Sequence, residues 1–208
     1  GAGTLLLSER GNLNGLAGNS IALSGNRIEQ RSVITGNGEI SFVAADDIQM
    51  ANGSLTESLS GNVTYRGKNI ALGSIKAVNG SVNLTANGAI SDNNGDDINI
   101  QANRWNADAI AGIGVGRFGS LGQDAIETDV NILSVRNAGK LQGDTKINIL
   151  NTDSLIIEQL RNNGDISIAN LTGDIILDNT NNEPFNINDS DARTQGGVIN
   201  AGTNGGIL

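Results

Sequence analysis

The chain has 208 residues and a formal net charge of −9, and it contains neither Cys nor His. The acidic balance argues against nucleic acid as a partner, because phosphate binding depends on Lys and Arg. Without Cys or His, a disulfide scaffold, a Ser-His-Asp or Cys-His centre and a His-based zinc site are all excluded. No apolar run approaches the roughly 20 residues that span a bilayer, so we expect no direct membrane insertion.

The composition also limits the kind of core that the chain can build. Aromatic residues make up 2% of the sequence and hydrophobic residues 38%, and there are 29 Gly. Because large rings usually supply much of a globular core, this core must be built from Ile, Leu, Val and Ala, which suits a narrow, repetitive interior. Abundant Gly and Asn tolerate the left-handed backbone of tight turns, so many turns at short intervals are expected.

Along the chain, short apolar-polar-apolar triplets recur. The first series begins at Ile21, Ile40, Val63, Val82, Ile98, Ile147 and Ile166. Three steps of this series are 19 residues long and two others are 23 and 16, with a gap in the series between Ile98 and Ile147. A second triplet follows 7 to 9 residues later in several repeats, beginning at Ile48, Ile70, Leu155 and Ile175. Such a period is typical of a solenoid, in which each repeat is one coil.

The repeat predicts an all-β fold, a right-handed parallel β-helix with coils of about 19 residues. About ten coils stacked at roughly 4.8 Å would form a rod on the order of 50 Å long. A β-sandwich fits less well, because its hairpins are antiparallel and its strands are usually longer. A doubly wound α/β fold needs long helices between its strands, and the sequence offers none.

Two stretches interrupt the repeat. Residues 104–123 contain the only Trp and are predicted to form a loop excursion, after which the repeat resumes near Ile126 and Val130. Residues 179–195, with the only Pro, form the second predicted excursion. Strand-like patterns reach both ends without a polar cap, so residues 1–208 are predicted to be a single β-helix segment of a longer chain.

The repeats resemble those of a known family. Residues 38–50 (GEISFVAADDIQM) and 80–90 (GSVNLTANGAI) look like repeats of filamentous-haemagglutinin-type adhesins. The stretch from Ile113 to Leu133 is similar to a phrase of very large bacterial haemagglutinin-like surface proteins. This resemblance implies export across the outer membrane of a Gram-negative bacterium, often by a two-partner route, and an extracellular or cell-surface location. It also implies a receptor or glycan on a host or neighbouring cell as the partner, with flanking repeats of the same chain.

Catalysis would have to rely on paired carboxylates. The candidate pairs are Asp46 with Asp47, Asp96 with Asp97, and Glu127 with Asp129. Glycoside hydrolysis needs two carboxyl groups some 5–10 Å apart across a sugar cleft. Adjacent residues of a strand point to opposite faces, so only Glu127 and Asp129 could share one. Because Asp residues commonly serve turns, we expect no catalytic residues and no enzyme.

Two further kinds of site are weak candidates. Clustered carboxylates suggest calcium ligands, namely Asp92, Asp96, Asp97, Asp189 and Asp191. Neither cluster matches a β-roll or EF-hand motif, so Asx turns are the favoured interpretation and no cofactor is predicted. Trp105 and Phe118 are candidates for stacking on a sugar, although lone rings more often cover the edge of a core.

The predicted function is a structural or adhesive β-helical rod in a secreted or surface-exposed bacterial adhesin or exoprotein. The alternative is a carbohydrate-binding or polysaccharide-cleaving β-helix. In either case we expect binding at the two excursions, because loops carry function on rigid scaffolds.

Overall fold

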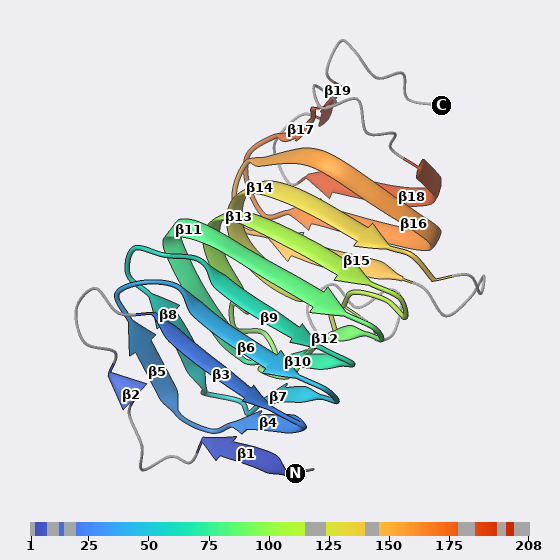
Figure 1. The fold of residues 1–208 in the computed structure, drawn as a ribbon. Coiled ribbons are helices and arrows are strands. Elements are labelled where there is room, and N and C mark those ends of the chain that lie inside the picture. The colour runs from blue at the N-terminus through green and yellow to red at the C-terminus, as the bar shows by residue number, and fades with distance from the viewer. Residues whose placement is uncertain are drawn as a thin grey trace.

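The computed structural model describes residues 3–7, 13–14, 20–114, 124–139, 146–178, 186–194 and 199–201. These residues form a parallel β-solenoid with coils about 22 residues apart and no helix (Figure 1). Accordingly, no helix in this part of the chain could cross a membrane. All pairings between its strands are parallel, so the predicted β-helix architecture is confirmed.

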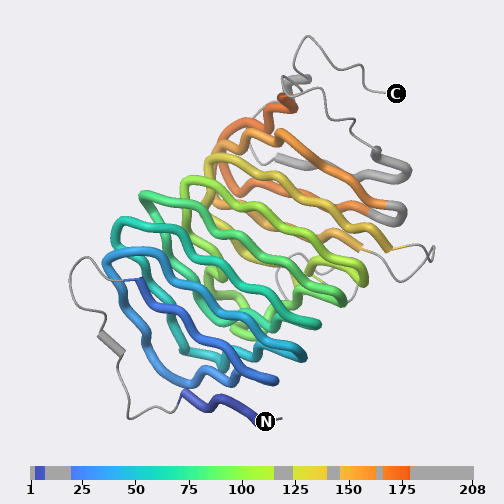
Figure 2. The backbone as a smooth tube through the Cα atoms, viewed as in Figure 1, coloured from blue at the N-terminus to red at the C-terminus, as the bar shows by residue number. Residues whose placement is uncertain are grey.

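Each coil passes over three faces, and several long strands bend around a corner and contribute to two of them (Figure 2). Face 1 carries β3 (Ile21–Gly25), β6 (Ile40–Ala44), β9 (Val63–Gly67), later parts of β11 (Ser74–Ala86), β13 (Ile100–Ala109) and β14 (Ile126–Asn137), the start of β16 (Leu155–Asn170), β17 (Ile175–Leu177) and β19 (Ile199–Ala201). Face 2 carries β1 (Thr4–Leu7), β4 (Arg27–Gln30), β7 (Ile48–Met50), β10 (Ile70–Leu72), β12 (Ile90–Asp92), β15 (Ile147–Asn151), the end of β16 and β18 (Asn186–Thr194). Face 3 carries β2 (Leu13–Asn14), β5 (Val33–Gly36), β8 (Leu55–Ser58) and the first parts of β11, β13 and β14.

Identical side chains stack on one another inside face 2. The register aligns one isoleucine from each successive coil, namely Ile28, Ile48, Ile70, Ile90, Ile113, Ile147 and Ile166. Each of these residues is at most 2% exposed. The alternation of a strand points every second residue inward, and β-branched side chains pack well on that pleated surface. This stack explains why the chain needs so few aromatic residues.

The corresponding inward stack of face 1 contains the larger side chains. Trp105 is aligned with Val82 on one side and Leu133 on the other, and it is 0% exposed. At the next inward position along the strands, Phe42 and Tyr65 stack with ring centroids 4.5 Å apart. The Tyr65 hydroxyl donates to Thr56 Oγ1 at 2.6 Å within the core, and burial raises the pKa of this phenol above its ordinary value.

The predicted excursions are wrong where the structure describes them. Residues 104–109 complete β13 and pair with β11 and β14, so this part of 104–123 belongs to the solenoid. Residues 186–194 form β18, which pairs with β16, so most of 179–195 is strand as well. Strand pairing explains both corrections, and the burial of Trp105 further explains the first. Residues 115–123, 179–185 and 195 lie outside the described residues.

The predicted coil length also needs correction. Some coils do have 19 residues, as between Ile21 and Ile40, but others have more, as between Trp105 and Leu133, and the average is about 22. The described strands of face 1, from β3 to β19, are linked in register by eight strand spacings, so the described stack is about 38 Å long at the usual spacing.

Candidate functional site

A row of polar side chains runs along the outside of face 1, and we call it the polar ladder. It consists of one residue from each of five consecutive coils, namely Thr64, Asn83, Asn106, Ser134 and Gln159. All five are partly exposed, whereas their sequence neighbours on β9, β11, β13 and β14 point inward. Strand alternation thus places hydroxyl and amide groups outside, one per coil and about 4.8 Å apart.

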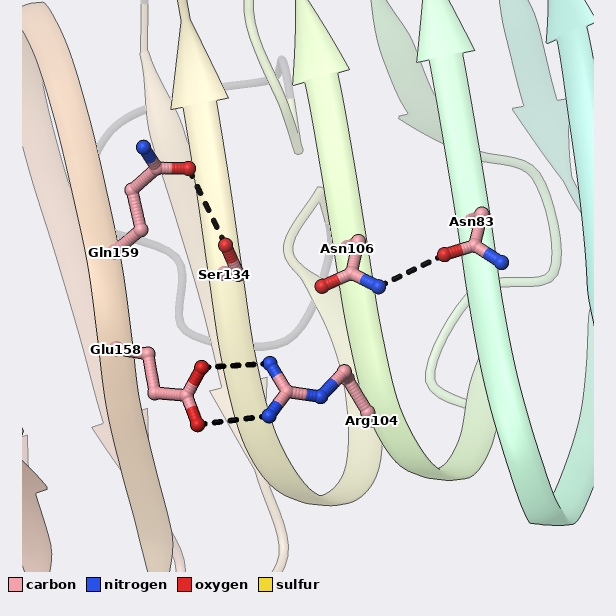
Figure 3. Close-up of polar contacts among 6 residues, drawn as sticks. All are labelled: Asn83, Arg104, Asn106, Ser134, Glu158 and Gln159. Carbon is pink, nitrogen blue, oxygen red and sulfur yellow. Dashed lines mark hydrogen bonds and ion pairs between the residues drawn. The ribbon is translucent and has the colours of Figure 1, made fainter. Parts of the chain in front are cut away.

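Members of the polar ladder bond to each other across coils (Figure 3). Asn106 Nδ2 donates to Asn83 Oδ1 at 2.8 Å, and Ser134 Oγ donates to Gln159 Oε1 at 3.3 Å. A carboxamide has two N–H donors and a carbonyl oxygen with two lone pairs, so a single bond leaves Asn83 and Asn106 with capacity for a ligand. These contacts orient the side chains without using up their hydrogen-bonding capacity.

Four of the charged residues beside the ladder form two ion pairs. Arg104 forms a bidentate ion pair with Glu158, with both N–O distances 2.7 Å, and the hydrogen bond to Glu158 raises the pKa of Arg104 (Figure 3). Arg136 Nε contacts Asp108 Oδ1 at 2.6 Å. Pairing of this kind fixes the side chains and reduces the net field along the row.

A hollow of about 310 Å³ follows the polar ladder and includes all five of its residues in its lining. The lining has no aromatic ring, and its Asp108 is paired with Arg136. It also contains Arg66, which forms no ion pair among the described residues and adds one positive charge. Hydrogen-bonding groups spaced along one axis suit an extended, hydroxyl-rich ligand. The lining is less suited to acid–base catalysis, which needs a positioned proton donor or acceptor with a matched pKa.

One of the two predicted sugar-stacking residues does not lie at the surface. Trp105 is 0% exposed and packs in the core, so the prediction that it stacks on a ligand is wrong. Its ring instead fills the interior where the neighbouring inward position is the small Ala107. Phe118, the second predicted residue, lies outside the described residues.

The predicted calcium ligands do not form a metal centre where they are described. Asp92 Oδ1 accepts hydrogen bonds from Asn94 N and Asn99 Nδ2, both at 2.8 Å, and Asp92 Oδ2 accepts from Gly95 N at 3.1 Å. This is the favoured Asx turn, in which Gly95 has a φ of +75°. Asp96 and Asp97 are exposed in the same turn, and the described residues hold no group of three acidic side chains that could bind a metal ion. The side chains of Asp189 and Asp191 lie outside the described residues.

Three of the carboxylates considered for catalysis, those of Asp46, Asp47 and Asp129, contact structural partners. Asp47 Oδ1 accepts from Asn69 Nδ2 at 2.8 Å, and Asp46 lies 3.7 Å from Lys68 Nζ. Asp129 accepts hydrogen bonds from Gln101 Nε2 at 2.8 Å and Thr152 Oγ1 at 3.1 Å. Glu127, by contrast, is buried, and its carboxyl has no partner among the described residues.

The polar ladder could be predicted only in part from the sequence. Thr64 and Asn83 are the central residues of recognised triplets, and the period aligns them. Asn106 was assigned to an excursion, and Gln159 follows a bulge in β16 that shifts the register. Binding was expected in loops, whereas this candidate site lies on the regular face of the solenoid.

Comparison of the sequence with protein-family models, curated proteins and solved structures finds no match. The fold alone therefore defines the class of this protein, a parallel β-solenoid.

Proposed function

We propose that this chain is a structural and adhesive rod segment of a bacterial surface protein or exoprotein. The observation that supports the proposal is the polar ladder, a linear, hydrogen-bonding surface held on a rigid stack of buried isoleucine, valine and leucine side chains. Parallel pairing along the whole described stack gives continuous hydrogen bonding along the rod axis, which suits a spacer that holds other modules away from a cell. The resemblance to filamentous-haemagglutinin-type adhesins supports the same function.

The ligand class that best fits the ladder is an uncharged, extended glycan on a host or neighbouring cell. Asn83 and Asn106 offer amide donors and acceptors one coil apart, and both types of group bind sugar hydroxyls. The overall charge of −9 disfavours anionic glycans. Without a ring in the hollow, single sugars should bind weakly, and affinity should grow with the number of coils that one glycan chain contacts.

A glycan array tests this proposal, using the purified chain with and without calcium. The key variant is Asn83→Ala/Asn106→Ala, which removes the 2.8 Å amide pair of the ladder. Its matched control is Asn103→Ala/Asn131→Ala, which removes a similar amide pair between coils, at 3.1 Å, away from the ladder. We expect the first variant to lose binding to linear neutral glycans by at least tenfold and the second to bind like the wild type. Equal binding by both variants would contradict the proposal.

Surface location is tested separately. An antibody against this chain should label intact, unpermeabilised cells of the bacterium that produces it. Labelling that requires permeabilisation would contradict the proposed location. Release of new reducing ends from a bound polysaccharide would instead support the alternative function, polysaccharide cleavage.

A further inference from the structure

Glu127, the second residue of β14, is a buried acid whose carboxyl has no hydrogen-bond partner among the described residues. The residue is 6% exposed, and neither of its two carboxyl oxygens has a partner among the described residues. Its backbone, by contrast, is fixed on one side by Asn99. Glu127 N donates to Asn99 Oδ1 at 2.9 Å, and Glu127 O accepts from Asn99 N at 2.9 Å. The backbone of Glu127 is therefore fixed, whereas its carboxyl has no partner in the part of the chain that the structure describes.

Among the described residues, the charges that act on this carboxyl have the same sign as its ionised form. They are Asp92 at the end of β12, Asp96 in the turn that follows, and Asp124 just before β14. The residues aligned with Glu127 from the adjoining segments, Asn99 and Leu150, are uncharged. Among the described residues, no side-chain donor or counter-ion contacts this carboxyl, and an unpaired charge is costly in a protein interior.

These surroundings shift the titration of Glu127 strongly. Burial is the largest cause, repulsion from the three aspartates adds to it, and together they outweigh the opposing effect of the residue's own backbone amide. The pKa of Glu127 is raised to about 8. The carboxyl is therefore neutral in the folded protein below that pH.

A bound cation is a weaker explanation for the unpaired carboxyl than a proton. Both oxygens of Asp92 are already occupied by donors from the turn, and the described residues contain no metal-holding group of acidic side chains. A proton needs no such set of ligands. Protonation neutralises the Glu127 carboxylate itself and leaves the turn from Asp92 to Asn99 intact.

We propose that Glu127 is a pH-sensitive element of the solenoid. In its neutral form, the turn from Asp92 to Asn99 packs closed against the start of β14, and loss of its proton loosens that contact. The unfolded carboxyl ionises near 4.5 and the folded one near 8. Between these values the folded state binds more protons than the unfolded state, so stability falls as pH rises through this window and levels off above it. The proposal is independent of the adhesive function.

The test measures the folding equilibrium constant by chemical denaturation from pH 4 to 9.5. The variants are Glu127→Gln, which keeps the shape without a charge, and Glu57→Gln as a control, because Glu57 is paired with Lys76 at 3.3 Å. As pH rises through the window, the folding constant of the wild type should fall by up to tenfold per pH unit relative to that of Glu127→Gln. Across the whole window the fall should be on the order of a thousandfold. Glu57→Gln should follow the wild type. Parallel profiles for wild type and Glu127→Gln would overturn the proposal.

A second measurement on the wild type covers the case in which Glu127→Gln does not fold. The side-chain carboxyl resonance of Glu127 should titrate near pH 8 in the native protein. Exchange of the Asn99 and Glu127 amides, corrected for the intrinsic effect of pH, should accelerate across the same range. Titration of this carboxyl below pH 6, or unchanged corrected exchange, would overturn the proposal.

Discussion

Replacement of Trp105 by Ala tests whether the solenoid runs without interruption through β13. Trp105 is 0% exposed and aligned with Val82 and Leu133 of the adjoining coils. Its Nε1 has no hydrogen-bond partner among the described residues, so the whole loss comes from packing. Deleting a buried indole removes its transfer free energy and leaves a cavity, which together cost about 3–5 kcal/mol. We expect Trp105→Ala to lower the free energy of unfolding by that amount, and Trp105→Phe by about 1–2 kcal/mol.

The assay is urea denaturation followed by far-ultraviolet circular dichroism, because the variant lacks the only Trp of the chain. Val43→Ala is the control, since Val43 is 43% exposed on the outside of β6 and should cost less than about 1 kcal/mol. In the wild type, Trp105 fluorescence should resist quenching by iodide until the protein unfolds. A cost of under 1 kcal/mol for Trp105→Ala, or ready quenching in the native state, would refute the placement of this ring in the core.

Three other substitutions test individual contacts, each by its effect on the free energy of unfolding. Tyr65→Phe should cost about 1–2 kcal/mol, because the buried hydroxyl donates to Thr56 at 2.6 Å, and an unchanged stability would argue against that bond. Arg104→Gln should cost about 1 kcal/mol or less, with a salt-dependent coupling to Glu158→Gln in a double-mutant cycle; zero coupling at low salt would count against the pair. Gly61→Ala should cost about 1–3 kcal/mol, because its Cβ would lie 2.5 Å from the carbonyl carbon of Gly38, whereas Gly3→Ala has nothing within 4 Å and should be neutral.

The architecture could be predicted because the same local pattern is used in every coil. Triplets beginning at Ile21, Ile40, Val63 and Val82 pair in the register that their spacing implies. A three-residue alternation is enough to decide which side chains face the interior, and repetition removes the ambiguity of any single strand. For these coils, the sequence pattern and the tertiary structure agree.

The triplet pattern gave a wrong prediction where a polar side chain is buried and hydrogen-bonded inside the core. Ile98-Asn99-Ile100 was predicted as a triplet with Asn99 outward, but Asn99 is 0% exposed and Ile98 is 39% exposed. The Asn99 amide donates to Asp92 at 2.8 Å and Asn94 at 2.7 Å, and its oxygen accepts from Glu127 N. Hydropathy alone cannot anticipate this network, because a fully bonded amide can be buried at little cost.

The strand at residues 104–109 could not be recognised from the sequence for a different reason. Its inward positions after Trp105 are Ala107 and Ala109, so the strand lacks the apolar contrast that marks the other coils. The interior of the solenoid has to be filled at every level, and one large ring can occupy space that small neighbours leave. That compensation between positions becomes visible only when the coils are stacked. For the same reason the polar ladder could not be followed beyond Asn83.

The measurement that most directly tests the account is the distance between spin labels at both ends of the outward row on face 1. Labels on Ser41→Cys and Gln159→Cys suit this purpose, because the chain contains no other Cys. Ser41 precedes the polar ladder in register with Thr64, so five coil steps separate the two positions. Stacked coils predict a narrow distribution near 24 Å between the two backbone positions, after allowance for the labels. A broad distribution, or a distance differing by more than one coil spacing, would contradict the continuous solenoid on which the ladder depends.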